Sequence, residues 1–255
     1  MPKKKFGQNF LNNNSIVNKI LFSEKISSKN ILEIGTGNLI LTKSILNKLP
    51  KKYVGIEIDQ DLLEQVKDEK IKKNLIQADA LKINELSFFN NETFSIISNL
   101  PFNISSQLLI KWCILHNENN CIDEMLLMFQ KELGERIIAK VNTKKYGGLS
   151  ILAQSVFSIS ERTRVEKIHF NPKPKVDAIV LKFKALEQPN IKKGEFQKLQ
   201  KITKFFFNER RKKNKKKFLK FFSFDQIKKN NFDKFFNLRA ENLDKNFYYE
   251  LTKII

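Results

Sequence analysis

Five short apolar runs, four of them followed by a stretch with helical spacing, constrain what this chain can fold into. Runs of this length are typical of buried strands, and their alternation with helices predicts a parallel, doubly wound sheet in an α/β fold. The runs lie at residues 30–35, 53–57, 74–78, 94–98 and 125–129, and helices are expected at 39–49, 60–68, 105–116 and up to 138. Two further stretches, 165–170 and 176–183, predict a closing hairpin.

The strand-like alternation stops after the expected hairpin, and Glu187–Asn190 has the composition of a linker. Beyond it, Lys-, Phe- and Asn-rich segments keep helical spacing to the end of the chain. We therefore expect a first domain over residues 1–186 and a small, all-helical domain over 187–255. Aromatic residues are more often core than base-stacking platforms, so the core of the second domain is expected to contain Phe205, Phe206, Phe207, Phe218, Phe221, Phe222, Phe235 and Phe236.

The chain is strongly basic, with 47 Lys and Arg against 27 Asp and Glu and a formal net charge of +20. Such a charge indicates a polyanionic partner, most simply nucleic acid. Codon bias is an alternative source of the lysines, because Lys, Asn, Ile and Phe all have AT-rich codons. The uneven distribution favours binding, since residues 187–255 alone carry 19 basic and 8 acidic side chains.

Other bulk features exclude some classes of protein. The chain has no apolar run long enough to span a membrane and no secretory signal, so we expect a cytoplasmic protein without a membrane partner. The two cysteines, Cys113 and Cys121, fit a reducing compartment. Together with His116 and His169 they match no common zinc spacing, so no metal site is expected.

Glycines and acidic residues follow the first three expected strands, where a nucleoside cofactor would bind. Gly35 and Gly37 allow a sharp turn and a close approach to a ligand. Glu57 ends the second strand 20 positions after Gly37, a place suited to a carboxylate that accepts from ribose hydroxyls, and Asp79 follows the third. A dinucleotide site would need a third glycine where this chain has Ile40. The pattern favours S-adenosylmethionine, with helix capping as the alternative role of Asp79.

The segment 99–105, Asn-Leu-Pro-Phe-Asn-Ile-Ser, follows the fourth expected strand. The Asn99 side-chain oxygen and the Leu100 carbonyl could accept the N–H groups of an adenine amine. Pro101 fixes the backbone, and Phe102 offers a face for stacking. The alternative is a strand end followed by a helix start, with Asn99 and Ser105 as ordinary turn or capping residues.

Taken together, these motifs resemble the small-subunit ribosomal RNA adenine dimethyltransferases of the KsgA type. The resemblance covers nearly the whole chain. It includes the glycine turn and the Asn99 segment, and also residues 6–11, 130–132, 146–150, 170–177, 207–212 and 238–243. Three places depart from the family pattern, and one of them is in the tail, where Lys213, Asn214 and Lys215 stand in a stretch in which the family tends to include Thr and Leu. Phe102 stands where the family usually has Tyr, and Leu39 stands where it often has a small residue.

The resemblance implies a Rossmann-like methyltransferase domain with a mostly parallel, seven-stranded sheet. It also implies dimethylation of the N6 amines of two adjacent adenosines in the loop of the 3′-terminal hairpin of small-subunit (16S) ribosomal RNA. S-adenosylmethionine would supply the methyl groups. The expected partner is this RNA within a partly assembled 30S particle, the expected role includes small-subunit biogenesis, and a monomer is expected.

Matching positions assign the site residues. Asn9 and Leu11 would close over the methionine part of the cofactor, and the cofactor set is Asn9, Leu11, Gly35, Gly37, Glu57, Ile58, Asp79, Ala80 and Asn99. The catalytic set is Asn99, Leu100, Pro101, Phe102 and Phe170, with Phe102 and Phe170 on either side of the target base, although Phe170 also fits a core position. Candidate phosphate contacts are Lys3–Lys5, Arg162, Arg164, Lys173, Lys175 and the basic run from Arg210 to Lys217, which includes Arg211 and Lys212. A solvated helix face is the alternative for that run.

Three alternatives remain. A large-subunit ribosomal RNA adenine methyltransferase of the antibiotic-resistance type shares the cofactor motifs, but residues 207–212 and 238–243 favour the small-subunit type. A ribosome-assembly factor without methylation would not need the filled catalytic positions. A nicotinamide-dependent oxidoreductase would need the missing third glycine.

Overall fold

The computed structural model describes Lys3 and residues 6–254, and the chain forms two compact units. The first unit consists of the residues up to Gly134 together with Ser158–Ala185. The second consists of Glu135–Phe157 together with the residues from Leu186 on. The C-terminal helices thus share a unit with 135–157, which the division after residue 186 assigns to the first domain. That division stays a prediction.

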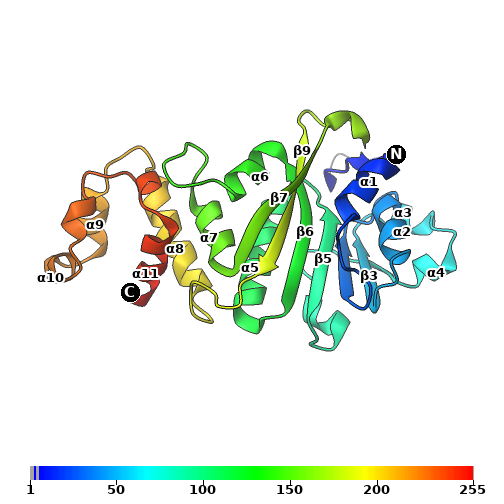
Figure 1. Ribbon diagram of the computed structural model, residues 1–255, viewed down its shortest axis with the longest axis horizontal. Helices are drawn as coiled ribbons and strands as arrows, with labels where there is room; N and C mark the ends of the chain where they lie inside the picture. The colour runs from blue at the N-terminus through cyan, green and yellow to red at the C-terminus, as the bar shows by residue number, and fades with distance from the viewer. Residues whose placement is uncertain (1–2, 4–5, 255) are drawn as a thin grey trace. The chain divides into compact units, whose positions relative to one another are not determined.

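A seven-stranded sheet forms the centre of the first unit (Figure 1). Its strands are β2 (Asn30–Ile34), β3 (Lys52–Glu57), β4 (Leu75–Gln77), β5 (Phe94–Asn99), β6 (Ile122–Gln130), β7 (Phe157–Val165) and β9 (Ala178–Ala185). Their order is β4-β3-β2-β5-β6-β9-β7, with parallel pairing from β4 to β6 and antiparallel pairing of β6 with β9. The predicted α/β fold with a mostly parallel sheet is confirmed. The strand order reverses between β2 and β5, and ligands bind at the carboxyl edge of such a switch point.

Of the helices in this part of the chain, one precedes the strands of the sheet and the others lie between them in the sequence. They are α1 (Asn14–Leu21), α2 (Ile40–Leu46), α3 (Gln60–Glu64), α4 (Glu69–Lys72), α5 (Ser105–Asn119) and α6 (Lys131–Ile137), with 3₁₀ segments at Glu85–Phe89 and Lys167–His169. None of the helices in the described part of the chain is long and apolar enough to cross a membrane.

The core of the first unit explains why α1 forms where it does. The side chain of Asn13 caps this helix by accepting from the backbone N–H of Ile16. Val17, Ile20 and Leu21 lie at helical spacing and are buried in a hydrophobic cluster that also contains strand residues. Burying each such side chain contributes about 1.5–3 kcal/mol. The helix fixes the chain directly after the segment that covers the candidate site.

The predicted hairpin over 165–170 and 176–183 is wrong in its first arm. β7 begins at Phe157 and ends at Val165, and it is β7 that lies beside β9 in the sheet. The residues after it form a 3₁₀ turn and the two-residue strand β8 (Phe170–Asn171). β8 pairs antiparallel with β1 (Phe10–Leu11) in a separate two-stranded sheet. The partner of β8 comes from the N-terminal segment, which no local pattern can reveal.

Helices make up the second unit. They are α7 (Gly148–Val156), α8 (Phe196–Asn208), α9 (Lys215–Phe221), α10 (Phe224–Lys229) and α11 (Lys245–Ile254), with 3₁₀ segments at Phe232–Phe235 and Ala240–Asn242. Phenylalanine rings fill its centre. Of the eight predicted core rings, Phe206, Phe218 and Phe222 are buried, and Phe205, Phe207, Phe221, Phe235 and Phe236 are half-buried. Phe218 alone contacts six other phenylalanine rings of this unit with centroid distances of 5.3–6.3 Å, those of Phe206, Phe222, Phe232, Phe235, Phe236 and Phe247. The predicted helical C-terminal region with an aromatic core is confirmed.

Candidate functional site

A cavity of about 320 Å³ opens at the carboxyl edge of β2, β3 and β5 in the first unit, a volume within the usual range of small-molecule sites. Of the predicted cofactor residues, all but Leu11 line it, as do Leu100 and Pro101 of the predicted catalytic set. The N-terminal segment supplies part of the wall through Phe6, Gly7, Gln8, Asn9 and Phe10.

The glycine turn after β2 leaves room for this N-terminal segment. Gly35 and Gly37 have φ values of 72° and 52°, in the left-handed region that favours glycine. A Cβ atom on Gly37 would lie 2.7 Å from the ring of Phe10. Leu39 also has a positive φ, 64°, at the start of α2, which explains why a small residue suits this position. It does not line the cavity, so its bulk leaves the pocket unchanged.

Two carboxylates lie on the cavity wall where the ribose and base acids were predicted. Glu57 is buried, and its two oxygens accept from the backbone N–H groups of Gly37 (2.9 Å), Ile58 (3.0 Å) and Asp59 (3.0 Å). Burial raises the pKa of the Glu57 carboxyl, and the three N–H bonds oppose that rise. The Asp79 carboxylate accepts from the backbone N–H of Leu81 at 3.0 Å. Asp79 therefore caps the following turn while its side chain stays 32% exposed beside the cavity.

Asn99, at the end of β5, has a hydrogen-bond partner for its side-chain nitrogen but none among the described residues for its side-chain oxygen. Its Nδ2 donates to the backbone carbonyl of Asn9 at 3.0 Å. Its Oδ1 is buried and has no hydrogen-bond partner among the described residues. Buried polar atoms are nearly always satisfied, so an unpaired acceptor in a cavity wall points to a ligand. The bond to Asn9 fixes which atom of the amide faces that ligand.

The N-terminal segment is tied down at several points. Lys3 Nζ and Gln8 Nε2 donate to the carboxylate of Asp59 at 2.5 and 2.9 Å, and Asn38 Nδ2 donates to the Leu11 carbonyl at 2.8 Å. Burial raises the pKa of the Asp59 carboxyl, but the bonds from Lys3 and Gln8 outweigh this and lower it. Sequence analysis missed Asp59 as a site residue, although its place two residues after Glu57 was a usable signal.

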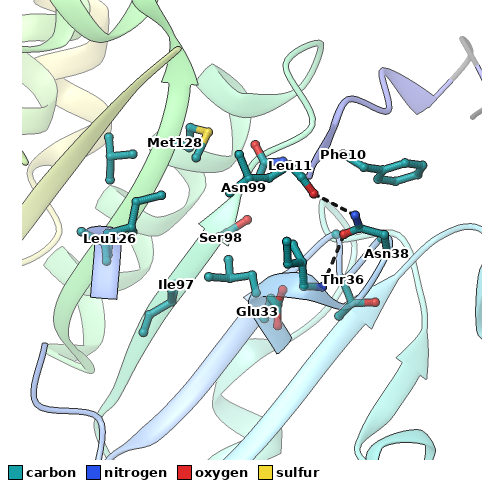
Figure 2. Close-up of a pocket in the computed structure, with 16 residues that line it drawn as sticks. Phe10, Leu11, Glu33, Thr36, Asn38, Ile97, Ser98, Asn99, Leu126 and Met128 are labelled. Atoms are coloured by element: carbon teal, nitrogen blue, oxygen red, sulfur yellow. Dashed lines mark hydrogen bonds between the residues drawn. The ribbon is translucent and has the colours of Figure 1, made fainter. Parts of the chain in front are cut away.

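A smaller hollow lies behind Asn99, and Figure 2 shows the side chains around it. Leu11 lines this hollow together with Phe10, Asn38, Ser98 and Met128. Glu33, also on its wall, is buried and accepts hydrogen bonds from the hydroxyls of Tyr53 (2.5 Å) and Thr42 (2.9 Å). Burial raises the pKa of the Glu33 carboxyl to about 8. Leu11 thus lies near the predicted site without reaching the larger cavity.

The two rings expected to enclose the target base already contact each other. The centroids of Phe102 and Phe170 are 6.5 Å apart and the rings are tilted by 60°. Phe170 is 4% exposed and belongs to the hydrophobic cluster of the unit, against which the partly buried Phe102 packs. This arrangement matches the core alternative for Phe170. A role in stacking stays a prediction and requires the rings to separate.

The predicted phosphate contacts differ in whether their charges are already paired. Lys3 pairs with Asp59 and Asp61, and Lys4 and Lys5 lie outside the described residues. Lys173, Lys175 and Arg211 are exposed. Arg162 donates to the carbonyls of Lys19 and Ile20, and Arg164 and Lys212 pair with Glu161 and Glu209. In the second unit, Arg210 binds Glu241 at 2.7 Å and the Thr143 carbonyl at 3.1 Å.

Lys217, at the end of the basic run, is not available to RNA. It is buried and donates to the carbonyls of Phe206 and Glu209 at the end of α8. Burial lowers the pKa of its ammonium group. The expectation of a phosphate contact there is therefore wrong, because the ammonium group is buried and binds carbonyls at the end of α8.

The sheet is mostly parallel and carries the cavity at its carboxyl edge. Two carboxylates and one unpaired amide oxygen line that cavity. These features together define a Rossmann-like methyltransferase domain. Comparison with known proteins identifies the type. The sequence pattern of the ribosomal RNA adenine dimethylase family matches residues 2–255. The chain therefore belongs to the ribosomal RNA adenine dimethylase family, and it is an enzyme of that type.

Relatives from bacteria and one solved structure agree with this membership. The chain is 38% identical over 254 residues to the ribosomal RNA small subunit methyltransferase A of Pelagibacter ubique. This alignment covers 98% of this chain and 95% of that protein. It is 35% identical to the protein of the same name from Mycoplasmopsis pulmonis, over 98% and 97% of the two chains. A dimethyladenosine transferase from Plasmodium falciparum superposes with a TM-score of 0.76 at 27% identity over 95% of both chains. The 23S rRNA methyltransferase ErmE, with a TM-score of 0.71, 18% identity and 96% and 98% coverage, shares the fold.

Proposed function

We propose that this enzyme uses S-adenosylmethionine to dimethylate the N6 amines of two adjacent adenosines in the loop of the 3′-terminal hairpin of small-subunit ribosomal RNA. The proposed substrate is the RNA in a partly assembled 30S particle. The single observation that carries the proposal is the buried, unpaired Oδ1 of Asn99, held toward the cavity by the bond from Nδ2 to the Asn9 carbonyl. An acceptor fixed in this way suits an amine donor.

The residues of the larger cavity fit the proposed cofactor. Glu57 would accept from the ribose hydroxyls through the lone pairs that its N–H bonds leave free, and Asp79 would face the adenine ring beside Ala80. Gly35 and Gly37 form the turn beside the cavity, and a Cβ atom on Gly37 would collide with Phe10 of the covering segment. When bound, S-adenosylmethionine supplies an electrophilic methyl group on a positively charged sulfur.

Asn99 and Leu100 would prepare the target amine. The lone pair of an adenine amine is delocalised into the ring, so the amine is a poor nucleophile. Two acceptors, Asn99 Oδ1 and the Leu100 carbonyl, favour a pyramidal nitrogen whose lone pair is available for in-line attack on the methyl carbon. Catalysis would come from positioning and electrostatics rather than from a strong base. Taking the base out of its stack costs a few kcal/mol, and less in a loop.

The test is methyl transfer from labelled S-adenosylmethionine to small ribosomal subunits that lack the loop dimethylation. We expect dimethyladenosine at two adjacent loop positions, and a loss of about 10²-fold or more in rate with Asn99→Ala. Asn119→Ala, at the exposed end of α5, is the matched control and should keep full activity.

Two results would contradict the proposal. Label on large subunits would favour the antibiotic-resistance type of enzyme. Tight binding to the small subunits without any label would favour an assembly factor. The small-subunit relatives at 35–38% identity support the enzyme that acts on the small subunit.

A further inference from the structure

Phe22, at the end of α1, is the most exposed large apolar side chain in the described part of the chain, at 84%. Single exposed apolar residues are common and need no explanation by themselves. Phe22 differs because the surface is hollowed on both sides of it. One hollow, of about 390 Å³, is lined by Asn18, Lys19, Phe22 and Arg162. The other, of about 300 Å³, is bounded by Phe22 together with Asn18, Leu21, Ser44, Asn47 and Lys48.

The surroundings of Phe22 are polar and positively charged. Lys19 and Lys48 make no ion pair with any described residue, so their charges are available to a ligand. Arg162 is held in place by the carbonyls of Lys19 and Ile20. Glu24 is 7% exposed, pairs with Lys182 at 2.8 Å and lies 4.0 Å from Arg162, so Lys19 and Lys48 carry the charge that remains available to an anion. An aromatic face among free cations is the combination that binds single-stranded nucleic acid.

We propose that Phe22 is a stacking platform for an unpaired RNA base, and that Lys19 and Lys48 contact the phosphates on either side of it. The proposal rests on the proposed function, because it assigns a second contact to the same RNA substrate. A protein partner with an apolar side chain is the rival occupant. The two unpaired lysines, Lys19 and Lys48, favour RNA. Binding of an apolar protein surface would remove water from their charges without supplying an anion in return.

The platform lies within reach of an RNA strand bound at Asn99. α1 begins at Asn14, three residues after β1, and β1 follows directly on Asn9, whose carbonyl binds the Asn99 amide. A helix of this length spans about 12 Å. Ile20, which lies in α1 two residues before Phe22, lines the smaller hollow behind Asn99, so Phe22 lies close in the chain to the candidate active site. A nucleotide near the reactive adenosine can occupy the platform while the adenosine is in the cavity.

The first experiment compares substitutions at Phe22 in binding to small ribosomal subunits that lack the loop dimethylation. Phe22→Trp keeps an aromatic face, whereas Phe22→Leu keeps only apolar surface. We expect Phe22→Ala and Phe22→Leu to weaken binding about five- to hundredfold and Phe22→Trp to keep native affinity. Ile168→Ala removes another side chain exposed at 61% in the same unit and should change nothing. Thermal unfolding should be unchanged in all four, because none of these side chains is buried.

The second experiment reads the platform directly. The only native tryptophan, Trp112, is fully buried, so the indole introduced by Phe22→Trp reports on its own surroundings. We expect a 12-nucleotide oligoadenylate to quench this fluorescence to saturation. Lys19→Ala with Lys48→Ala should lower the salt dependence, by about 0.7 in the slope of log affinity against log salt for each lost phosphate contact.

Each result decides for or against the platform. Native affinity in Phe22→Ala, or no quenching by oligoadenylate, overturns it. Loss of subunit binding in Phe22→Ala but not in Phe22→Leu shows an apolar protein contact and also overturns it. Failure of the proposed function is a separate result, because it appears as an absence of methyl transfer in the native enzyme, whereas the fluorescence titration tests the platform without any methylation.

Discussion

At the scale of single residues, the buried carboxyl of Glu33 connects the stability of the first unit to pH. Its pKa is raised to about 8 by burial, against an ordinary value of 4.5. The folded state therefore holds a proton that the unfolded chain releases. The Glu33 contribution is fully present below about pH 4.5 and is lost as pH rises to 8. The hydroxyls of Tyr53 and Thr42 bind the carboxyl in either state.

We predict that Glu33→Gln removes this part of the pH dependence. The amide keeps an acceptor for both hydroxyls and does not ionise. Between pH 5 and 8 the native free energy of unfolding should fall relative to that of the variant, by at most about 1.4 kcal/mol per pH unit. Urea titrations of both proteins at pH 5, 6.5 and 8 measure the difference. Parallel curves would show that Glu33 is ionised in the folded state throughout.

At the scale of elements, the N-terminal segment is held over the cavity by Asp59. We predict that Asp59→Asn weakens binding of S-adenosylhomocysteine about tenfold, because hydrogen bonds from a charged group to a buried partner are the strong ones. The asparagine can still cap α3, so the fold should be kept. Isothermal titration calorimetry at low and high salt measures the effect, and only the native affinity should fall with salt.

Asp61 offers a matched control for this element. It also binds Lys3, at 2.8 Å, but its side chain is 66% exposed. Exposed ion pairs contribute little, so Asp61→Asn should bind the cofactor product almost as the native protein does. Equal losses in the two variants would mean that general charge near the cavity matters and that the bonds to Asp59 do not.

The same elements show which features of the fold and the site could be predicted from the sequence. Strands such as β2 and β5 could be predicted because they are buried on both faces and read as continuous apolar runs. The carboxyl-edge position of Glu57, Asp79 and Asn99 follows from that pattern. The pairing of β1 with β8 could not be predicted, because Phe10 and Asn171 meet only in the folded chain. The Nδ2 bond of Asn99 to Asn9 depends on that pairing, so the orientation of the predicted catalytic amide could not be predicted either.

At the scale of the whole molecule, the two compact units divide the chain differently from a cut after residue 186. α7 packs with α8 and α11, and Tyr249 donates from its hydroxyl to the Ile151 carbonyl at 3.0 Å. We predict that a fragment ending at Leu186 exposes the buried face of α7, including Ile151 and Val156. Each buried aliphatic side chain contributes about 1.5–3 kcal/mol, so the fragment should bind a hydrophobic dye and melt well below the full chain. An equal melting temperature would establish residue 186 as a true domain boundary.

The hydrogen bond between the Asn9 carbonyl and the Asn99 amide must form again after each cofactor exchange if the covering segment moves. On the proposed function, four methyl groups require four cofactor molecules. Residues 6–10 form part of the cavity wall, so we expect this segment to move at each exchange. Opening that wall breaks the Asn9–Asn99 bond and frees the Asn99 amide to rotate. An enzyme caught between two transfers can then hold its RNA while being unable to react with it. During each cofactor exchange the enzyme stays bound to the particle, and the RNA of that particle is not methylated.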